Sequence, residues 1–503
     1  MKSPAQYKMS GVSGHRGSGN PGRGKVGKTG KTSGAPIRGK SGQDSKPNNK
    51  DVKEMFLKRI QLCSVTYDYS DETKDVKAKS ERITALQELK EFLSDTKNVA
   101  QYVIPHLEPV MEMIQKNVFR PLPMDKKAGD KLGPGEAGVD EEEVIIDPAW
   151  PHLQGVYEFF FELIISEATD VKSLKVFITP YFVQEFLQLF DSEEPRERDY
   201  LKNILHRLYA KLVPRRRMIR KAINDCFLTM IHETQRFNGA SELLDILAAI
   251  ISGFAVPLRE EHVIFFKTII IPLHKVQTSH LFHEQLLRCS MLFLSKDHSL
   301  AIHLVEGLLR YWPFGNSPKE ILFLAELQEV LEICENAKLE ALIPKLFKRL
   351  VRCISGPQLQ VADRAMCFFE NDYFLGILRT YKQSTFPMVV PVIVELAETH
   401  WHKILQESLN ALKVILKEID PVAFDRALQT GSREAARNNS LKAMHHLPQR
   451  ASAEAKWDAL TAKAKAVNPN FVPPTLPYVD THVVGLNNMN GEVLNSGNLI
   501  PPV

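Results

Sequence analysis

Cationic and aromatic side chains recur at helical spacing in residues 199–220, DYLKNILHRLYAKLVPRRRMIR. Lys202, His206 and Tyr209 are three or four residues apart, so they lie along one flank of a helix. The consecutive arginines Arg215–Arg217 open the next helix, where positive charge opposes the helix dipole unless an anion compensates it. This pattern favours a surface that binds an acidic ligand, and the alternative is a solvated basic face.

Apolar residues predict the helix that positions this flank. On a helix of 3.6 residues per turn they fall on one side, which can face a core: Leu201, Ile204, Leu205, Leu208 and Leu212. Pro214 ends this first helix. The segment is therefore expected to form a helical hairpin with the cationic flank exposed.

One segment, residues 22–29, matches the phosphate-binding loop pattern G-x-x-x-x-G-K-T letter for letter. A working loop of this kind follows an apolar strand and precedes a helix. Both flanks here are low-complexity sequence instead. We therefore predict no nucleotide site.

Other catalytic patterns do not occur in the sequence. There is no G-x-S-x-G elbow, no H-E-x-x-H motif, no kinase motif set and no metallophosphatase set of Gly-Asp and Asn-His segments. Three close histidine pairs lack a cysteine or carboxylate frame suited to zinc: His280 with His283, His400 with His402, and His445 with His446. The prediction is a protein with no catalytic residues, no metal site and no cofactor.

Composition indicates an intracellular protein. The 503 residues carry a net charge of only +4, although residues 1–50 are rich in Lys and Arg with Asp44 as their single acid. The six cysteines stand singly in apolar helical patterns, which predicts reduced, buried thiols. We expect no signal peptide. We also expect no membrane span, because Asp245 and Lys267 interrupt the most apolar runs.

Residues 51–430 show helical periodicity almost throughout. An Ile-Pro punctuation recurs at Ile271 and Ile343, 72 residues apart, which is close to two helix-pair repeats of roughly 40 residues. This predicts an all-α, HEAT-like or armadillo-like superhelix, that is, an α-solenoid. Within it, Ser317–Glu320 forms a capping-box pattern at which a helix begins, and Lys319 is expected at the surface.

Three segments outside this pattern are expected to be disordered or mobile, with a functional role as the alternative for the long loop. Residues 1–50 lack large apolar side chains and are expected to form a disordered basic tail. A long loop at about 120–150 includes the acidic run Asp140–Glu143. Residues 431–503 are expected to be a C-terminal extension that is partly helical and largely mobile.

From these patterns three binding functions remain open. The first is a solenoid that presents short motifs or partner subunits along its surface. The second is a polyanion or nucleic-acid binder that uses the tail and Arg215–Arg217, which the charge balance of the folded part disfavours. The third is a structural scaffold without a discrete ligand site.

Five longer segments are similar to a known family. They are AWPHLQGVYEFF at 149–160, LFDSEEPRERDYLKNILHRLY at 189–209, NGASELLDILAAIISGFAVPLREEH at 238–262, YWPFGNSPKE at 311–320 and VADRAMCFFEND at 361–372. Over roughly Lys53 to Asp425 the chain closely resembles the B-prime family of regulatory subunits of protein phosphatase 2A.

The resemblance implies a HEAT-like superhelix without catalysis of its own. It also implies assembly with a phosphatase scaffold subunit and a phosphatase catalytic subunit. Substrate proteins would be recruited through a groove for L-x-x-I-x-E motifs with phosphorylated or acidic flanks. We expect such a chain in the cytoplasm and the nucleus, with no membrane or nucleic-acid partner.

The residues of this groove carry over from the family position by position. The basic and aromatic wall matches Lys202, His206, Arg207, Tyr209 and Arg216. Ile246 and Ile250 match the apolar floor, and the remaining matches are Asp245, Arg259 and His262. Many members have Glu at the position of Asp245 and Lys at that of Arg259, so motif selectivity is expected to differ modestly. Truncating Tyr209, Arg207 or Ile246 is expected to leave folding intact, because these side chains are expected on the flank of the helices and not on their core side.

Overall fold

The computed structural model describes residues 49–69, 71, 73–122, 147–334, 339–431, 457 and 460–466, and all regular secondary structure in these ranges is helical. Contacts divide the chain into Met1–Val52 and Lys53–Val503. The described part of the first unit is the first turn of α1 (Asn49–Cys63). The expected basic tail, the acidic run Asp140–Glu143 and most of the C-terminal extension lie outside the described residues.

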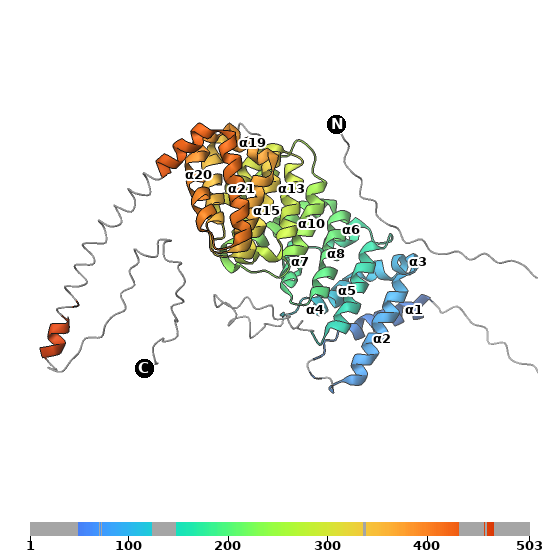
Figure 1. Ribbon diagram of the computed structural model, residues 1–503. Coiled ribbons are helices and arrows are strands. Elements are labelled where there is room, and N and C mark those ends of the chain that lie inside the picture. The colour runs from blue at the N-terminus through green and yellow to red at the C-terminus, as the bar shows by residue number, and fades with distance from the viewer. Residues whose placement is uncertain are drawn as a thin grey trace, which may run out of the picture. The chain divides into compact units, whose positions relative to one another are not determined.

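The second unit is built from helices that pack in two rows (Figure 1). Each helix of the first row packs against the next: α2 (Val76–Leu93), α5 (Trp150–Ile165), α8 (Pro195–Lys211), α10 (Ala240–Ser252), α13 (His283–Leu294), α15 (Ser317–Ile333) and α18 (Leu359–Met366). The second row contains α7 (Pro180–Gln188), α9 (Arg216–Thr229), the continuous segment α11–η6–α12 (Glu260–Phe265, Phe266–Ile270, Ile271–Leu273), α14 (Ala301–Arg310), α17 (Ile343–Ile354) and α20 (Lys382–Thr399).

Helices that are consecutive in sequence also pack as pairs across the rows. Examples are α4 (Leu107–Val118) with α5, α14 with α15, and α17 with α18. The pair α20 and α21 (Lys403–Ile419) follows, and residues 421–431 continue as helix. A stack of helix pairs, each contacting its neighbours, is the architecture of an α-solenoid. The predicted fold class is confirmed.

Short helices and helical turns connect these elements. They are α3 (Thr96–Asn98), η1 (Val99–Val103), η2 (Ile104–His106), α6 (Val171–Phe177), η3 (Leu189–Asp191), η4 (Val213–Arg215), η5 (Met230–Thr234), η7 (Gln277–Leu281), η8 (His298–Leu300), η9 (Glu340–Leu342), η10 (Cys367–Glu370) and α19 (Asp372–Thr380).

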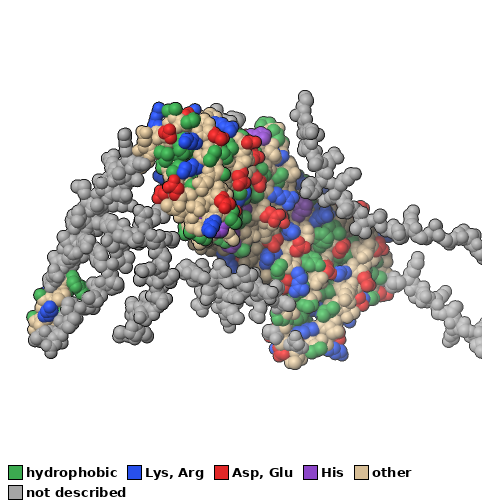
Figure 2. Space-filling view, in the orientation of Figure 1, with side chains coloured by type: hydrophobic (Ala, Val, Ile, Leu, Met, Phe, Trp, Pro, Cys, Tyr) green, Lys and Arg blue, Asp and Glu red, His purple; other side chains and the backbone are tan. Residues whose placement is uncertain are grey.

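The core is one continuous apolar cluster between the two rows. Large side chains such as Phe160, Phe227, Phe293 and Phe347 are buried in it. A single helix pair cannot bury its apolar face alone, so stacking of neighbouring pairs supplies the hydrophobic stabilisation. On the visible surface acidic and basic side chains are interspersed (Figure 2), as expected from the small net charge.

The apolar side of α8 faces this core as its periodicity predicts. Leu201, Ile204, Leu205, Leu208 and Leu212 are all at most 1% exposed. The helix ends at Lys211, and the chain turns through η4 into α9. The predicted hairpin is confirmed.

A buried carboxylate anchors the first turn of α8. The Oε1 atom of Glu197 accepts hydrogen bonds from Arg120 (2.8 Å) and from the Tyr157 hydroxyl (2.6 Å), and its Oε2 atom accepts one from Ser192 (2.5 Å). Arg120 also donates to Asp147 at 3.0 Å. Glu197 is completely buried, and these partners compensate for the loss of its hydration.

The start of α15 differs from the predicted capping box. The helix begins at Ser317 as predicted, but the side chain of Asn316 caps it by accepting from the Lys319 amide at 3.2 Å. Glu320 accepts from the Trp312 indole at 3.1 Å and so does not close a box. Lys319 is 3% exposed and donates to the Val276 carbonyl at 2.6 Å, so its expected surface position is wrong. The neighbouring repeat covers it through η7, a contact that single-helix periodicity does not reveal.

All six cysteines are free thiols, and four of them are buried while Cys226 and Cys367 are partly buried. Burial raises the pKa of Cys63 to about 11 and that of Cys289 to about 12. Within the described ranges no helix has the length and apolar character needed to span a bilayer.

Candidate peptide-binding surface on α8, α9 and α10

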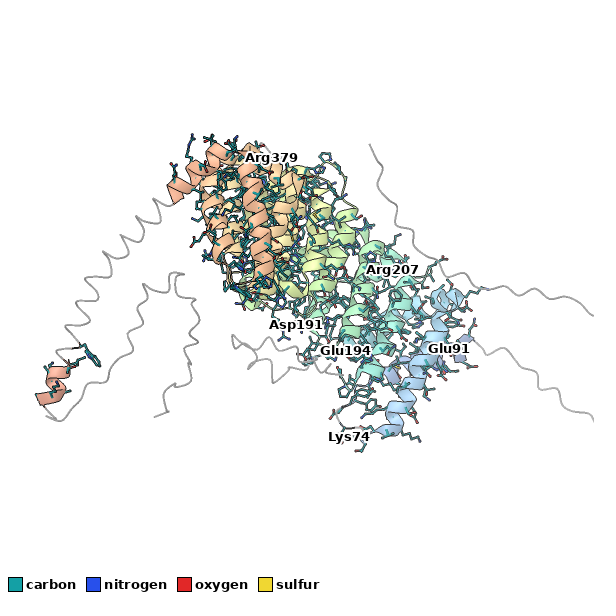
Figure 3. All side chains as sticks on the ribbon, viewed as in Figure 1. Lys74, Glu91, Asp191, Glu194, Arg207 and Arg379 are labelled. Carbon is teal, nitrogen blue, oxygen red and sulfur yellow. The ribbon has the colours of Figure 1, made fainter. Side chains whose placement is uncertain are left out.

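The cationic flank of α8 is open to solvent in its last three turns. His206 and Arg207 are exposed, and among the described residues neither has a hydrogen-bond or ion-pair partner. Figure 3 labels Arg207 on this helix. Lys202 and Tyr209 are half-buried on the same helix. The flank therefore offers charged groups that a ligand can reach without displacing an internal contact.

Tyr209 is held by two arginines from α9. The guanidinium of Arg216 lies over the Tyr209 ring, 5.2 Å from its centroid, and that of Arg220 donates to the Tyr209 hydroxyl at 3.1 Å. Both contacts fix the ring of a residue that sits at the end of α8. A preorganised aromatic group loses less conformational entropy when a ligand binds to it.

The arginine run at the start of α9 is partly compensated by backbone carbonyls. Arg216 donates to the carbonyls of Tyr209 (2.9 Å) and Ala210 (3.1 Å), which are unsatisfied groups at the negative end of α8. Arg215 donates to the Lys175 carbonyl at 3.0 Å. Only Arg217 of the run is fully exposed. The run therefore mainly stabilises the backbone around the junction of α8 and α9, and less of it is available to bind a polyanion.

Asp245 on α10 links the surface across the two neighbouring helices. Its carboxylate lies 4.0 Å from the Lys202 ammonium and 3.8 Å from the guanidinium of Arg288 on α13. Lys202 also pairs with Asp199 at 2.9 Å. The hydrogen bond with Asp199 raises the pKa of Lys202 despite partial burial, and the charge of Asp245 adds to this effect.

The two isoleucines of the expected apolar floor are part of the core. Ile246 is 2% exposed and Ile250 is 6% exposed, and both belong to the continuous apolar cluster. The expected position of Ile246 on an exposed flank is therefore wrong, and its truncation is now expected to destabilise the fold. Loss of a buried isoleucine to alanine typically costs about 2–5 kcal/mol of stability. Side chains on α8 and α9 are better probes of ligand binding.

His262 and Arg259 occupy the start of α11. The His262 ring stacks on Phe254, with centroids 3.7 Å apart and planes 4° apart, and its Nδ1 atom is buried without a partner. Arg259 is 78% exposed at the N-cap position and lies 3.9 Å from Glu261. The histidine is thus fixed, whereas the arginine is free to reorient toward a ligand.

The charge state of His262 follows from its surroundings. Burial lowers its pKa, the carboxylate of Glu261 opposes this, and the cations Arg220 and Arg259 add to the lowering. The imidazole is therefore neutral at pH 7 and can donate one hydrogen bond to an acceptor.

The structure brings several predicted residues together and leaves others apart. Lys202 meets Asp245, and Tyr209 meets Arg216. Arg220 connects this pair to His262, through a hydrogen bond to Tyr209 and through its charge acting on the imidazole. Arg259 accepts a backbone hydrogen bond from the His262 amide at 2.9 Å, but its side chain has no contact with the predicted residues of α8, α9 and α10 in the described part of the chain.

Sequence reasoning missed three participants on this surface. Arg220 follows Arg216 by one helical turn, so the same periodicity that selected Tyr209 would have found it. Phe254 and Arg288 come from a loop and from the next repeat, and nothing in the sequence of α8 or α10 indicates them.

The arrangement can bind but has no means of catalysis. Its polar groups are guanidinium, ammonium, imidazole and carboxylate side chains spread over five helices, with no nucleophile next to a base. Among the described residues no group of three or more His, Cys, Asp or Glu side chains is arranged to hold a metal ion. A cationic and aromatic surface on a helical-repeat protein is typical of an interaction subunit.

Comparison with known proteins gives the same class and specifies the family. The sequence profile described as "Protein phosphatase 2A regulatory B subunit (B56 family)" matches residues 42–464. The B' eta isoform of the 59 kDa regulatory subunit of serine/threonine protein phosphatase 2A from Arabidopsis thaliana is 38% identical over 383 residues, 76% of this chain and 74% of the relative. The human 56 kDa regulatory subunit delta isoform is 36% identical over 433 residues, 85% and 69% of the two chains.

The delta 1 isoform of Schizosaccharomyces pombe is 39% identical over 374 residues, 74% of this chain and 67% of the relative. Solved structures of an engineered protein and of Kap121p align with TM-scores of 0.30 and 0.25 at 12% and 13% identity, too low to carry an argument. They cover 74% and 76% of this chain, and 97% and 47% of their own.

These matches define the chain as a regulatory subunit and not a phosphatase. It belongs to the B56 family of protein phosphatase 2A regulatory B subunits. The resemblance stated from five sequence segments is confirmed.

Proposed function

We propose that this chain docks on the scaffold and catalytic subunits of protein phosphatase 2A and recruits substrate proteins that carry L-x-x-I-x-E motifs. The motif binds across α8, α9 and α10. Family membership supports the docking, because the matched relatives are named as regulatory subunits of this phosphatase. The motif assignment rests on the family resemblance together with the surface just described.

The observation that carries the proposal is the cluster Tyr209, Arg216 and Arg220 next to the unpartnered side chains of His206 and Arg207. Its fixed aromatic ring suits an aliphatic side chain of the motif. The free guanidinium of Arg207 and the free imidazole of His206 can donate hydrogen bonds to a phosphate or carboxylate within it.

The glutamate of the motif has a separate place at the start of α11. His262 presents a fixed, neutral imidazole there, and exposed Arg259 supplies a mobile cation. A carboxylate that accepts from both gains one hydrogen bond from a rigid donor and one charge-assisted hydrogen bond. Glutamate thus fits this place better than glutamine, which has no charge.

The test is a titration of a fluorescent L-x-x-I-x-E peptide against the full chain. Central arginine or aromatic contacts typically cost about 2 kcal/mol when truncated, roughly thirtyfold in affinity. We expect this loss for Arg207→Ala and for Tyr209→Ala. Arg207 is exposed, so its variant should keep the circular dichroism and melting temperature of wild type.

Lys417→Ala, which removes an exposed cation on α21, is the matched control and should bind normally. Unchanged affinity in the Arg207 and Tyr209 variants, or an equal loss in the Lys417 variant, would contradict the proposal. A motif peptide with its glutamate replaced by glutamine should bind less tightly to wild type.

A further inference from the structure

A second cationic site lies farther along the solenoid, between α14 and α17. A pocket of about 530 Å³ opens there over two leucines, Leu309 and Leu342. Its polar walls hold one carboxylate and five cations: Glu306, Arg310, Lys345, Lys348, Arg349 and Arg352. The volume is within the range of natural ligand sites, roughly 300–1,000 Å³. None of these residues belongs to the surface on α8, α9 and α10.

The cations of α17 form one stripe. Lys345, Lys348, Arg349 and Arg352 follow the i, i+3, i+4, i+7 spacing of a single helix face. Like charges at this spacing repel each other. In the part of the chain that the structure describes, neither these four residues nor Arg310 has a carboxylate within 4.0 Å, so the repulsion is not relieved by a direct ion pair.

Aromatic rings hold two of these cations in place. Phe314 is 55% exposed, and the guanidinium groups of Arg349 and Arg352 lie 4.3 Å and 4.5 Å from its centroid. Arg349 also lies 5.2 Å from the ring centroid of Trp312, and its Nε atom is buried without a partner. Guanidinium groups fixed against rings lose little conformational freedom when they bind an anion.

The floor of the pocket distinguishes between anionic ligands. Leu309 and Leu342 are 8% and 7% exposed, and they line the same pocket as the cations. An inositol phosphate or a nucleic-acid backbone has no aliphatic group to place on them. A peptide with an aliphatic side chain between acidic residues fills the floor and neutralises the walls.

We propose that the α14–α17 pocket is a second docking site, which binds an acidic segment of a partner protein. The segment places one aliphatic side chain on Leu309 and Leu342 and directs Asp, Glu or phosphoserine side chains at Lys345, Lys348 and Arg352. Arg349, which Phe314 holds in place, forms the rigid wall of the pocket.

The experiment measures fluorescence anisotropy of a labelled peptide in which aspartates flank a single leucine, added to the full chain. We expect saturable binding that weakens with salt. The double charge reversal Lys348→Glu with Arg352→Glu should lower affinity at least about tenfold. Lys403→Glu with Lys417→Glu is the matched control, because it makes the same change of net charge on exposed positions of α21, and its affinity should stay within about twofold.

Two further measurements test whether this site is independent of the peptide-binding surface on α8, α9 and α10. Arg207→Ala should bind the acidic peptide normally, and the double reversal should bind an L-x-x-I-x-E peptide normally. Loss of acidic-peptide binding in the Arg207 variant, or an equal loss in the α21 control, overturns the proposal.

Three other results would also overturn it. They are undiminished binding after glycine replaces the leucine of the peptide, tighter binding of inositol hexaphosphate or an RNA oligonucleotide than of the peptide, and a tenfold gain in affinity after Asp140–Glu143 are neutralised. The last result would make the chain itself the occupant of the pocket.

Discussion

His152 shows how a single buried side chain links stability to pH. It is 3% exposed, its Nε2 atom lies 3.3 Å from the Asn117 amide oxygen, and its Nδ1 atom has no partner. Buried Arg82 also donates to that amide oxygen. Burial, reinforced by the charge of Arg82, lowers the pKa of His152 to about 3. Protonating this imidazole in the folded chain would place two cations in one apolar site.

The free energy of unfolding is therefore expected to decrease as the pH falls below 6.5. The unfolded chain binds a proton at His152 near pH 6.5, whereas the folded chain does not until about pH 3. The stability that comes from a neutral His152 is fully present above pH 6.5 and is lost progressively as the pH falls toward 3. At pH 5.5 the loss amounts to about 1.4 kcal/mol.

Urea unfolding of wild type and His152→Gln at pH 7.5, 6.5 and 5.5 checks this expectation. The variant should lose about 1 kcal/mol less than wild type over that range, since other histidines titrate equally in both. Parallel pH profiles would show that His152 does not carry the effect.

At the same scale, residue types predicted much of the motif surface but not its internal contacts. The period of α8 places Lys202, His206 and Tyr209 on one flank, and the structure confirms it. That Arg216 would turn back to the Tyr209 carbonyl depends on the angle between α8 and α9. The periodicity of apolar residues in the sequence carries no information on that angle.

Two glycines show that packing between helices can reverse the effect of helix propensity. A Cβ atom at Gly307 in α14 would lie 2.2 Å from the Ile271 Cγ2 atom of α12. The two helices can therefore pack this closely only because Gly307 has no side chain. A Cβ at Gly376 in α19 would meet no atom within 4 Å. Both positions are inside helices, where alanine is intrinsically favoured over glycine by about 1 kcal/mol.

Gly307→Ala is expected to lower the melting temperature and Gly376→Ala to raise it. Overpacking costs about 1–3 kcal/mol, which exceeds the gain in propensity at position 307, whereas only the gain applies at position 376. Thermal unfolding followed by circular dichroism measures both. Shifts of the same sign would refute the role of the Ile271 contact.

The existence of the helices was predictable from apolar periodicity, but their contacts with neighbouring repeats were not. The start of α15 at Ser317 was found correctly, whereas the cap at Asn316 and the burial of Lys319 were not. The burial of Lys319 depends on η7, which contacts α15 from the neighbouring repeat, whereas the cap at Asn316 is a local contact that the sequence analysis missed.

At the scale of the whole molecule, the solenoid separates functions along its length. Among the described helices the main contacts join neighbouring repeats, so a change on one helix has mainly local effects. A binding surface on α8 can thus be altered without disturbing distant repeats.

We therefore expect Arg207→Ala to separate substrate recruitment from assembly. In a pull-down, the tagged variant should recover the phosphatase scaffold and catalytic subunits as wild type does, but lose proteins with L-x-x-I-x-E motifs. Purified alone, neither chain should hydrolyse a phosphopeptide. Loss of the phosphatase subunits together with the motif proteins would show that the two functions share one surface.

The buried carboxylate of Glu197 also has a use in protein engineering. Glu197 accepts hydrogen bonds from Arg120, and Arg120 also donates to Asp147. These bonds fix the chain at Arg120 and at Asp147, on either side of residues 123–146. A flexible insert that joins two fixed points costs little closure entropy, about 0.6 kcal/mol for each doubling of its length. A fluorescent reporter or an affinity tag can therefore be spliced between these anchors while both termini stay native.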